Sequence, residues 1–422
     1  MNKNKINWVA VLTMMFLFGM IAFVTNLAAP IGVIWKQAPG IEGSNFWGMM
    51  GNMMNFLAYA FMGIPAGKLI TKIGYKKTTL IGVGVGLAGV FVQFLSGKIG
   101  VGATLAGLPA NFFVYLLGAF VCGFSVCILN TVVNPMLNLL GGGGNKGNQL
   151  VQIGGTFNSL MGTLTPMLVG ALIGSVTKDT MITDVNLVLF IAMGVFAATF
   201  AILTFIPFVE PEQEKNDISV KSLFEYRHLV FGVIAIFLYV GVEVGIPGTM
   251  NFFLTDTLGT ANAATTAGFV AGTYWFLMLI GRFVSSVISG KVSSRTQLAV
   301  TSATAIVLVV VAMFTTNVQA SMPVFTGSGF GMAQVPLTAL LLVLCGLCTS
   351  VMWGAIFNLS VEGLGKKSAA ASGLFMTMVI GGGILPLLQN AIADATTATI
   401  GLPLRTIATT RTTSTSTRTK RT

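Results

Sequence analysis

Residues 116–135 read LLGAFVCGFSVCILNTVVNP, and residues 339–358 read ALLLVLCGLCTSVMWGAIFN. The Cys122-Gly123 pair of the first stretch recurs as Cys345-Gly346 in the second, about 220 residues later. Further landmarks recur at nearly the same offset, namely Gly63 as Gly281, and Gly162 with Pro166 as Gly382 with Pro386. A chain whose two halves repeat the same apolar helices in the same sense predicts two pseudo-symmetric bundles.

The composition places most of the chain in lipid. Only 8% of the 422 residues are charged, 54% are hydrophobic, and the mean hydropathy is +0.85. A soluble protein with this composition would expose large apolar surfaces to water. Stretches of about 20 apolar residues, the length that crosses a bilayer, begin near eleven residues: Trp8, Phe46, Thr79, Asn111, Leu150, Asn186, Leu229, Asn262, Gln297, Ala333 and Ser368. We therefore expect an all-α membrane protein.

The second half lacks one helix that the repeat predicts. Residues 1–208 form a six-helix bundle, 209–228 a charged cytoplasmic linker, and 229–395 a bundle of five helices. The twelfth helix should follow, but residues 405–422 read RTIATTRTTSTSTRTKRT, which a bilayer would not accept. We interpret the Thr/Ser/Arg-rich tail, 396–422, as the product of a shifted reading frame, with a disordered terminus as the alternative. A groove facing lipid should mark the place of the missing helix.

The distribution of positive charge predicts the orientation in the membrane. Assigning the loops alternately to the two sides gathers most cations on the side of the N-terminus: Lys3, Lys5, Lys68, Lys72, Lys76, Lys77, Lys146, Lys215, Lys221, Arg227, Lys291, Arg295, Lys366 and Lys367. Before the tail, the other side keeps only Lys36, Lys98 and Lys178. The positive-inside rule makes the Lys-rich side cytoplasmic. The formal net charge of +11 therefore indicates topology in the cell membrane, and we expect no nucleic-acid partner.

Motifs of soluble enzymes carry no chemistry in this context. The glycines at 84, 86 and 89 fit G-x-G-x-x-G, but they lie inside an apolar span with no strand before them. Cys345 and Cys348 form C-x-x-C within a membrane helix, where small residues let helices pack closely. His228 is the only histidine, and one histidine cannot form a metal site. We expect no catalytic residues, no metal and no enzyme activity.

Polar side chains inside the spans are the candidates for function, because they are costly in lipid. Glu243 is the only carboxylate well inside a span. Burying its charge costs about 2.5 to 3.5 kcal/mol on insertion scales, so it should stay protonated until a cation arrives, as a coupling-ion site does. A structural hydrogen bond is the alternative. Amides, which both donate and accept, suit the hydroxyl groups of a neutral polyol. The candidates are Asn26, Asn130, Asn134, Asn158, Asn251, Asn358 and Gln389.

Several short motifs resemble one branch of a known transporter family. They are Pro65-Ala66-Gly67, Leu69, Lys72, Tyr75 and Lys76; Asn130-Thr131-Val132-Val133-Asn134-Pro135; Thr156-Phe157-Asn158-Ser159; Gly281-Arg282-Phe283; and Gly381-Gly382-Gly383. Over about residues 8 to 395, the chain resembles the fucose permease and glucose/galactose transporter branch of the major facilitator superfamily. The resemblance implies the major facilitator fold. It also implies a cytoplasmic gate, which we assign to Gly67, Lys72, Lys76 and Lys77, with Arg282 near the cytoplasmic end of its span.

Two departures from the branch bear on ion coupling. The resemblance places Asn130 where members usually carry Glu, and Ala29 where a proton-coupled member carries Asp. Neither an amide nor an alanine titrates, which excludes proton carriage at these two positions. Glu243 matches a glutamate of the glucose/galactose relatives. We therefore expect either coupling to sodium or protons through Glu243, or no coupling at all.

The sequence thus predicts a carrier of a monosaccharide such as fucose, glucose or galactose, working as a monomer by alternating access without a cofactor. Trp275, Trp353 and Phe357 would supply an apolar wall for the sugar ring. Trp353 occupies the place in the second half that Asn130 holds in the first. Two alternatives stay open: a carrier of a drug-like solute or an organic anion, and a sugar sensor that does not transport.

Overall fold

The computed structural model describes residues 8–396 with gaps at 142–143, 175, 178, 206–219, 259, 261, 289–291, 326–328 and 365–367. The first half contains α1 (Trp8–Trp35), α2 (Asn45–Ile73), α3 (Tyr75–Leu95), α4 (Ala110–Leu140), α5 (Gly144–Ile173) and α6 (Asn186–Phe205). The second half contains α7 (Arg227–Leu258), α8 (Ala263–Ile288), α9 (Ser294–Met313), α10 (Leu337–Val361) and α11 (Ser368–Thr377). A 3₁₀ turn, η4 (Met378–Ile380), leads from α11 into a further helix at 381–396.

Eleven of the described segments are long and apolar enough to cross a membrane, and Ala371–Thr396 forms the last of them. The eleven predicted spans are therefore confirmed. Most of the linker and all of the tail beyond residue 396 lie outside the described residues. The described part of the linker contains one 3₁₀ turn, η2 (Val220–Leu223).

The fold is mostly helical, as expected, with two antiparallel β-hairpins in the connections between helices. The first is short, pairing β1 (Thr104–Leu105) with β2 (Leu108–Pro109). The second joins α9 to α10 and pairs β3 (Gln319–Phe325) with β4 (Phe330–Pro336). It also corrects the tenth span, which begins at Leu337 and not near Ala333, because Ala333 lies in β4.

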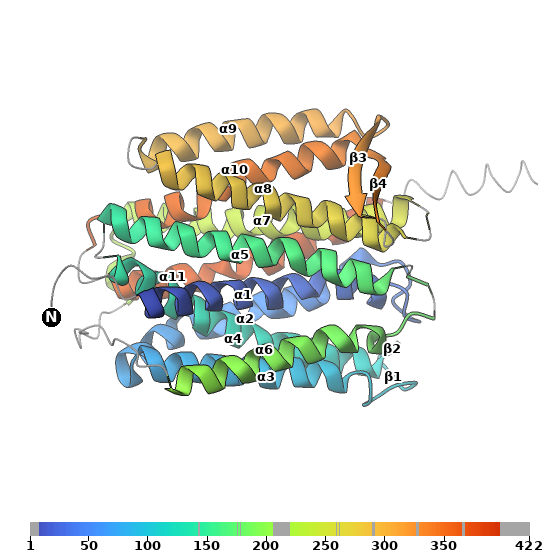
Figure 1. Ribbon diagram of the computed structural model, residues 1–422, viewed down its shortest axis with the longest axis horizontal. Coiled ribbons are helices and arrows are strands. Elements are labelled where there is room, and N and C mark those ends of the chain that lie inside the picture. The colour runs from blue at the N-terminus through green and yellow to red at the C-terminus, as the bar shows by residue number, and fades with distance from the viewer. Residues whose placement is uncertain are drawn as a thin grey trace, which may run out of the picture.

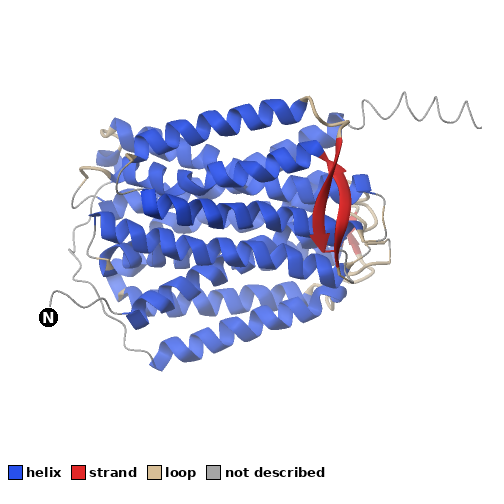
Figure 2. Ribbon diagram, turned by 45° about the horizontal axis from the view of Figure 1, so that its top comes forward, coloured by secondary structure: helices blue, strands red, loops and turns tan. Residues whose placement is uncertain are grey.

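The helices run side by side, so that both hairpins lie at one end of the molecule (Figures 1 and 2). We call it the hairpin end, and the opposite end, from which α1 starts, the N-terminal end (Figure 1). The two halves meet where α5 packs against α8 and α2 packs against α11. These are equivalent pairs if the second half repeats the first, since α5 corresponds to α11 and α2 to α8.

The shared Cys-Gly landmark marks the same helix crossing in both halves. A side chain at Gly123 of α4 would strike the backbone oxygen of Asn55 in α2. A side chain at Gly346 of α10 would likewise strike the backbone oxygen of Tyr274 in α8. Small residues allow such close backbone approach between helices in lipid. The repeat read from the sequence therefore has a physical basis in the same close helix contact.

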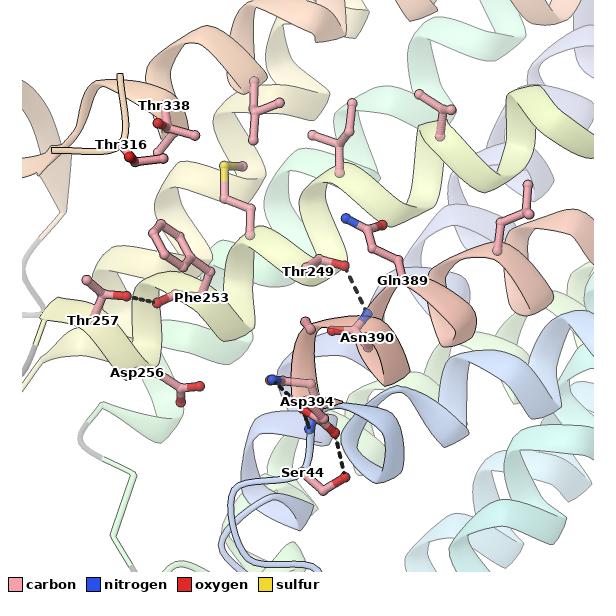
Figure 3. A pocket seen from close by; sticks show the side chains of 18 of the residues that line it. Ser44, Thr249, Phe253, Asp256, Thr257, Thr316, Thr338, Gln389, Asn390 and Asp394 are labelled. Atoms are coloured by element: carbon pink, nitrogen blue, oxygen red, sulfur yellow. Dashed lines mark hydrogen bonds between the residues drawn. The ribbon is translucent and has the colours of Figure 1, made fainter. Parts of the chain in front are cut away.

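The two bundles differ at their periphery. In the first, α6 packs against α3, and Phe196 of α6 fills the space that Gly86 leaves. In the second, α9 packs against α10, and only Gln297 and Ala312 of α9 are buried. A groove of about 1190 Å³ lies between α7, α9, α10 and the 381–396 helix (Figure 3). The described residues contain no twelfth helix, and the groove lies beside α7 and α9, with the start of α2 at one end. We call it the lipid-facing groove after the expectation above, which stays a prediction.

Candidate functional site

A cavity of about 100 Å³ lies between the two bundles, near the middle of the spans. Its walls come from α1, α2, α4, α5, α7, α8 and α10 together with η4. Seven of the residues expected to bind substrate or ion line it: Asn26, Asn130, Asn134, Asn158, Glu243, Trp275 and Trp353. Helices far apart in the sequence thus bring most of the predicted side chains to one place.

Glu243 and Arg282 form a buried ion pair in this cavity. The distance from Arg282 Nη2 to Glu243 Oε1 is 3.3 Å, and both side chains are at least nine-tenths buried. The hydroxyl of Tyr239 donates to the same carboxylate oxygen at 2.8 Å. Arg282 Nη1 also donates to the backbone oxygen of Gly155 in α5 at 2.7 Å. Arg282 therefore links the carboxylate of one bundle to the backbone of the other.

Arg282 was expected near the cytoplasmic end of its span, and its side chain lines the central cavity. Its backbone lies near the C-terminus of α8, toward the N-terminal end of the molecule, which suggested a place in a cytoplasmic gate. The long side chain instead reaches into the central cavity, where Glu243 provides the opposite charge. A buried charge needs a partner of opposite charge, because the cost of removing an ion from water is otherwise not compensated. A role of Arg282 in the cytoplasmic gate stays a prediction.

The amides of α4 form a chain of hydrogen bonds at one wall. Asn130 Nδ2 donates to the hydroxyl of Tyr59 in α2 at 2.7 Å. Asn134 Nδ2 donates to the backbone oxygen of Asn130 at 2.9 Å. Both asparagines are buried. Each amide uses its N–H group on the protein, and among the described residues no partner of either side-chain oxygen is found. Those oxygens can accept hydrogen bonds from ligand hydroxyls.

Asn26 and Asn158 occupy the wall formed by α1 and α5. Asn158 Nδ2 donates to the backbone oxygen of Phe18 in α1 at 3.0 Å, which joins the two helices. Asn26 Nδ2 donates to the backbone oxygen of Ala22 at 2.9 Å. These bonds fix the orientation of each amide, so that the acceptor oxygen of each is held in a defined place.

Aromatic rings form two matching walls of the cavity. Trp275 of α8 packs over Gly162 of α5, and Phe56 of α2 packs over Gly382 of the 381–396 helix. A Cβ at Gly162 would come within 3.0 Å of Trp275, and one at Gly382 within 2.7 Å of Phe56. Gly162 and Gly382, which are equivalent in the repeat, thus each leave room for an aromatic ring from the opposite bundle.

Trp353 contributes to the cavity from α10. It packs edge-on against Tyr239 and Phe375, with ring centroids 6.3 and 5.9 Å away. Phe357, one turn further along α10, packs against Phe375 instead and does not line the cavity. Trp275, Trp353 and Phe56 therefore line the cavity and Phe357 does not, and a role of these rings in binding a sugar stays a prediction.

Three of the predicted amides lie elsewhere. Asn251 lines a separate cavity of about 20 Å³, next to the central one on the side of the hairpin end. Gln389 is exposed and lines the lipid-facing groove (Figure 3). Asn358 is half-buried and does not line the central cavity. For these three residues, the structure gives no contact with the central site.

The basic residues between α2 and α3 lie at the N-terminal end. Lys72 and Lys77 are exposed. Lys76 Nζ donates to the backbone oxygen of Thr204 at 3.1 Å, which ties α3 to α6 within one bundle. A Cβ at Gly67 would meet no neighbouring atom. The place of these residues near the predicted cytoplasmic surface is compatible with a gate, and their role stays a prediction.

Sequence reasoning missed several polar residues of the cavity. Gln152 of α5 and Ser350 of α10 are buried and line it. The Gln152 amide lies against Gly354 of α10, where any side chain would collide with it. Tyr59 was also missed, although its hydroxyl is the partner of Asn130. Gln152 could have been found, because it is a polar residue on the same helix as Asn158.

The chain resembles known transporters in sequence. Residues 9–387 match the profile of the Major Facilitator Superfamily. A glucose/galactose transporter of Brucella abortus is 30% identical over 348 residues, which cover 81% of this chain and 77% of that protein. The L-fucose-proton symporter of Escherichia coli is 23% identical over 368 residues, again covering 81% and 77%.

The fold has a counterpart among solved structures. A crystal structure of the Escherichia coli fucose:proton symporter superposes with a TM-score of 0.67 at 19% identity, and 93% of each chain is covered. The internal repeat, the membrane-length helices and the polar cavity between the bundles agree with the profile match. The chain belongs to the Major Facilitator Superfamily.

Proposed function

We propose that this protein carries a neutral monosaccharide such as fucose, glucose or galactose across the cell membrane by alternating access. The similar transporters named above act on such sugars, as their names state. The central cavity offers what a sugar requires: amide oxygens for hydroxyl groups, and the rings of Trp275, Trp353 and Phe56 for the apolar face.

The observation that carries this proposal is the ion pair of Glu243 with Arg282. A cavity that binds an organic anion needs a cation available to it. Arg282 is the only cation among the residues lining the central cavity, and it is already paired with Glu243 at 3.3 Å. The net charge of the lining is therefore zero when Glu243 is ionised. A neutral polyol fits this cavity better than an organic anion.

The size of the cavity supports alternating access. Pockets that bind small molecules usually measure about 300 to 1,000 Å³, whereas this cavity measures about 100 Å³. The bundles have to move apart at one end before a sugar can enter. Such rocking of one bundle against the other around a central site is how transporters of this kind alternate their access.

Glu243 is the candidate for ion coupling, and a proton is the ion that we favour. Protonation of Glu243 would remove its negative charge and release Arg282 from the pair. Arg282 also bonds to Gly155 of the opposite bundle, so a change at Glu243 reaches the contact between the bundles. Coupling at this site would bypass Asn130 and Ala29, which cannot bind protons. We infer that the protein is a proton-linked sugar symporter with no cofactor and no catalytic site.

The orientation follows from charge. The cations at the N-terminal end include Lys72, Lys76 and Arg227, which the positive-inside rule assigns to the cytoplasm. The hairpin end then faces outward. We expect the protein to be a monomer in the cell membrane, because one chain supplies every wall of the central cavity.

Competition in proteoliposomes tests the class of substrate. Uptake of labelled glucose, galactose and fucose is measured with and without an imposed proton or sodium gradient, and excess unlabelled sugars or organic anions are added. The proposal expects inhibition by monosaccharides, accumulation driven by an inward proton gradient, and no effect of a drug-like amphiphile. Inhibition by organic anions alone would overturn it. Saturable sugar binding without accumulation would identify a sensor.

A further inference from the structure

A second polar network joins the two bundles at the hairpin end, away from the central cavity. Lys36, which follows α1, donates to the carboxylate of Asp256 in α7, with Nζ 2.6 Å from Oδ2. It also donates to Asn45 Oδ1 at 2.7 Å, and its charge lies 5.0 Å from the centre of the Phe252 ring. The Lys36 side chain is 2% exposed. This lysine is therefore buried where the two bundles meet at the hairpin end.

Asp394 makes the second cross-bundle contact. Its carboxylate accepts a hydrogen bond from Ser44 Oγ at 2.9 Å (Figure 3). It also accepts hydrogen bonds from the backbone N–H groups of Asn45 at 3.0 Å and Phe46 at 2.9 Å. These groups lie at the start of α2, where backbone N–H groups lack partners within the helix. Negative charge is favourable at this end of a helix. A carboxylate of the second bundle therefore caps a helix of the first.

Asn45 connects the two contacts into one network. Its side-chain oxygen accepts from Lys36, and its Nδ2 donates to Asp394 at 2.7 Å. The network thus runs from Asp256 through Lys36 and Asn45 to Asp394. Both carboxylates belong to the second bundle, and both Lys36 and Asn45 belong to the first. Separation of the bundles at this end has to break every one of these contacts.

The helices that lead to the network are interrupted at equivalent places. Pro30 follows Asn26 by four residues in α1, and Pro247 follows Glu243 by four residues in α7. The two pairs are 217 residues apart, since 243 − 26 = 217 and 247 − 30 = 217. A proline removes the helical hydrogen bond to the carbonyl four residues before it, which favours bending there. Residues of the central cavity therefore stand directly before the points where α1 and α7 can bend.

We propose that Lys36, Asn45, Asp256 and Asp394 form the external gate of the carrier. The gate holds the hairpin end closed, and it opens when the parts of α1 and α7 beyond Pro30 and Pro247 move apart. The assignment of the hairpin end to the outside rests on the proposed function. The gate itself rests on the contacts that join the two bundles. These four residues position the bundles during transport and do not touch the substrate.

Access of a thiol reagent from outside tests the gate. Ala29→Cys places a reporter in the cavity of about 20 Å³ that lies between the central cavity and the gate. The native cysteines, at 122, 127, 345 and 348, are buried, and the protein without the reporter gives the background. Labelling by a membrane-impermeant maleimide is followed in intact cells. We expect Asp256→Asn and Asp394→Asn each to raise the labelling rate of the reporter at least tenfold.

A charge exchange makes the test specific. Lys36→Asp alone places two carboxylates together and should give fast labelling, whereas Lys36→Asp combined with Asp256→Lys should return the rate to within about threefold of the parent. The matched control is Asp179→Asn, an exposed carboxylate of the same end, which should leave the rate unchanged. Equal rates in the parent, Asp256→Asn and Lys36→Asp, with all variants monodisperse in detergent, would overturn the proposal. Fast labelling that the charge exchange does not reverse would also overturn it.

The labelling requires no sugar, so its outcome is independent of the substrate. If the gate variants label fast but no monosaccharide is transported, the gate stands and the proposed function fails. If sugar is transported but the gate variants label as slowly as the parent, the gate fails and the proposed function stands.

Discussion

Glu243 of α7 lies four residues before Pro247 and 3.3 Å from the guanidinium of Arg282 in α8. This carboxylate therefore adjoins both the central cavity and the point where α7 can bend toward the proposed external gate. A change in its charge would act on the ion pair, on the bond from Arg282 to Gly155, and on the shape of α7. The arrangement gives a physical route from ion binding to the movement of the bundles.

Glu243→Gln should separate exchange from accumulation. Exchange of labelled for unlabelled sugar needs no net movement of an ion, so the variant should retain it. Accumulation driven by a proton gradient should be lost, because an amide does not titrate. Both are measured in proteoliposomes of equal protein content. Accumulation that survives in the variant would show that the carboxylate has a structural role only.

Loss of one partner of the ion pair should also lower the thermal stability of the protein. Removing one partner of a buried pair leaves the other charge uncompensated, which costs about 3 to 5 kcal/mol. Glu243→Gln should therefore lower the melting temperature in detergent. The combined variant Glu243→Gln with Arg282→Gln removes both charges and should recover most of the loss. A single variant as stable as the parent would mean that the pair contributes nothing to the fold.

Asn130 and Asn158 should contribute directly to sugar affinity. Each can accept hydrogen bonds from hydroxyl groups, and a hydrogen bond contributes about 0.5 to 1.5 kcal/mol. The double variant with alanine at both positions should bind sugar at least tenfold more weakly, as measured by isothermal titration. Asn358→Ala is the matched control, because Asn358 does not line the cavity. Unchanged affinity in the double variant would exclude both amides from the binding site.

Gln389→Leu should leave sugar affinity within about twofold of the parent. Gln389 is exposed in the lipid-facing groove (Figure 3), and a polar group facing lipid is unfavourable. The variant should therefore be at least as stable as the parent. A large loss of affinity would place Gln389 in the binding site and contradict the geometry described above.

Glycines at helix crossings should be intolerant of substitution. Gly123→Ala would drive a methyl group into the backbone of Asn55, and overpacking of this kind costs about 1 to 3 kcal/mol. Gly194→Ala in α6 meets no neighbouring atom and should be neutral or slightly stabilising, since alanine favours helix. Melting temperatures of the two variants give the comparison. Equal melting temperatures would show that α2 and α4 pack less closely at Gly123 than the short distance to Asn55 indicates.

The sequence was sufficient for the number and order of the helices. Apolar spans of membrane length are a strong signal, and the eleven predicted spans correspond to eleven among the residues that the structure describes. The hairpin before α10 was missed because its strands, which include Ala333 and Val335, are apolar enough to be taken as the start of the next span. The sequence Thr-Gly-Ser-Gly at residues 326–329 was the available signal for a hairpin.

The site was only partly predictable, for a reason that applies to membrane helices in general. A helix that is apolar on all sides gives no periodic signal for the face that lines the cavity. Asn130 and Gln389 look alike in the sequence, but one faces the cavity and the other the groove. The depth of Arg282 was misjudged because its backbone position does not reveal how far its side chain reaches. Only the packing of the helices decides these questions.

Counterflow is the measurement that tests the central claim most directly. Proteoliposomes containing the full chain are loaded with unlabelled galactose, fucose or glucose and diluted into a trace of the same labelled sugar. A carrier with alternating access exchanges the internal sugar for the external label, so the account predicts a transient accumulation above the external concentration. Gln389→Leu should retain this overshoot, and alanine at both Asn130 and Asn158 should reduce it. Binding of the labelled sugar without any overshoot, for all three sugars, would contradict the account.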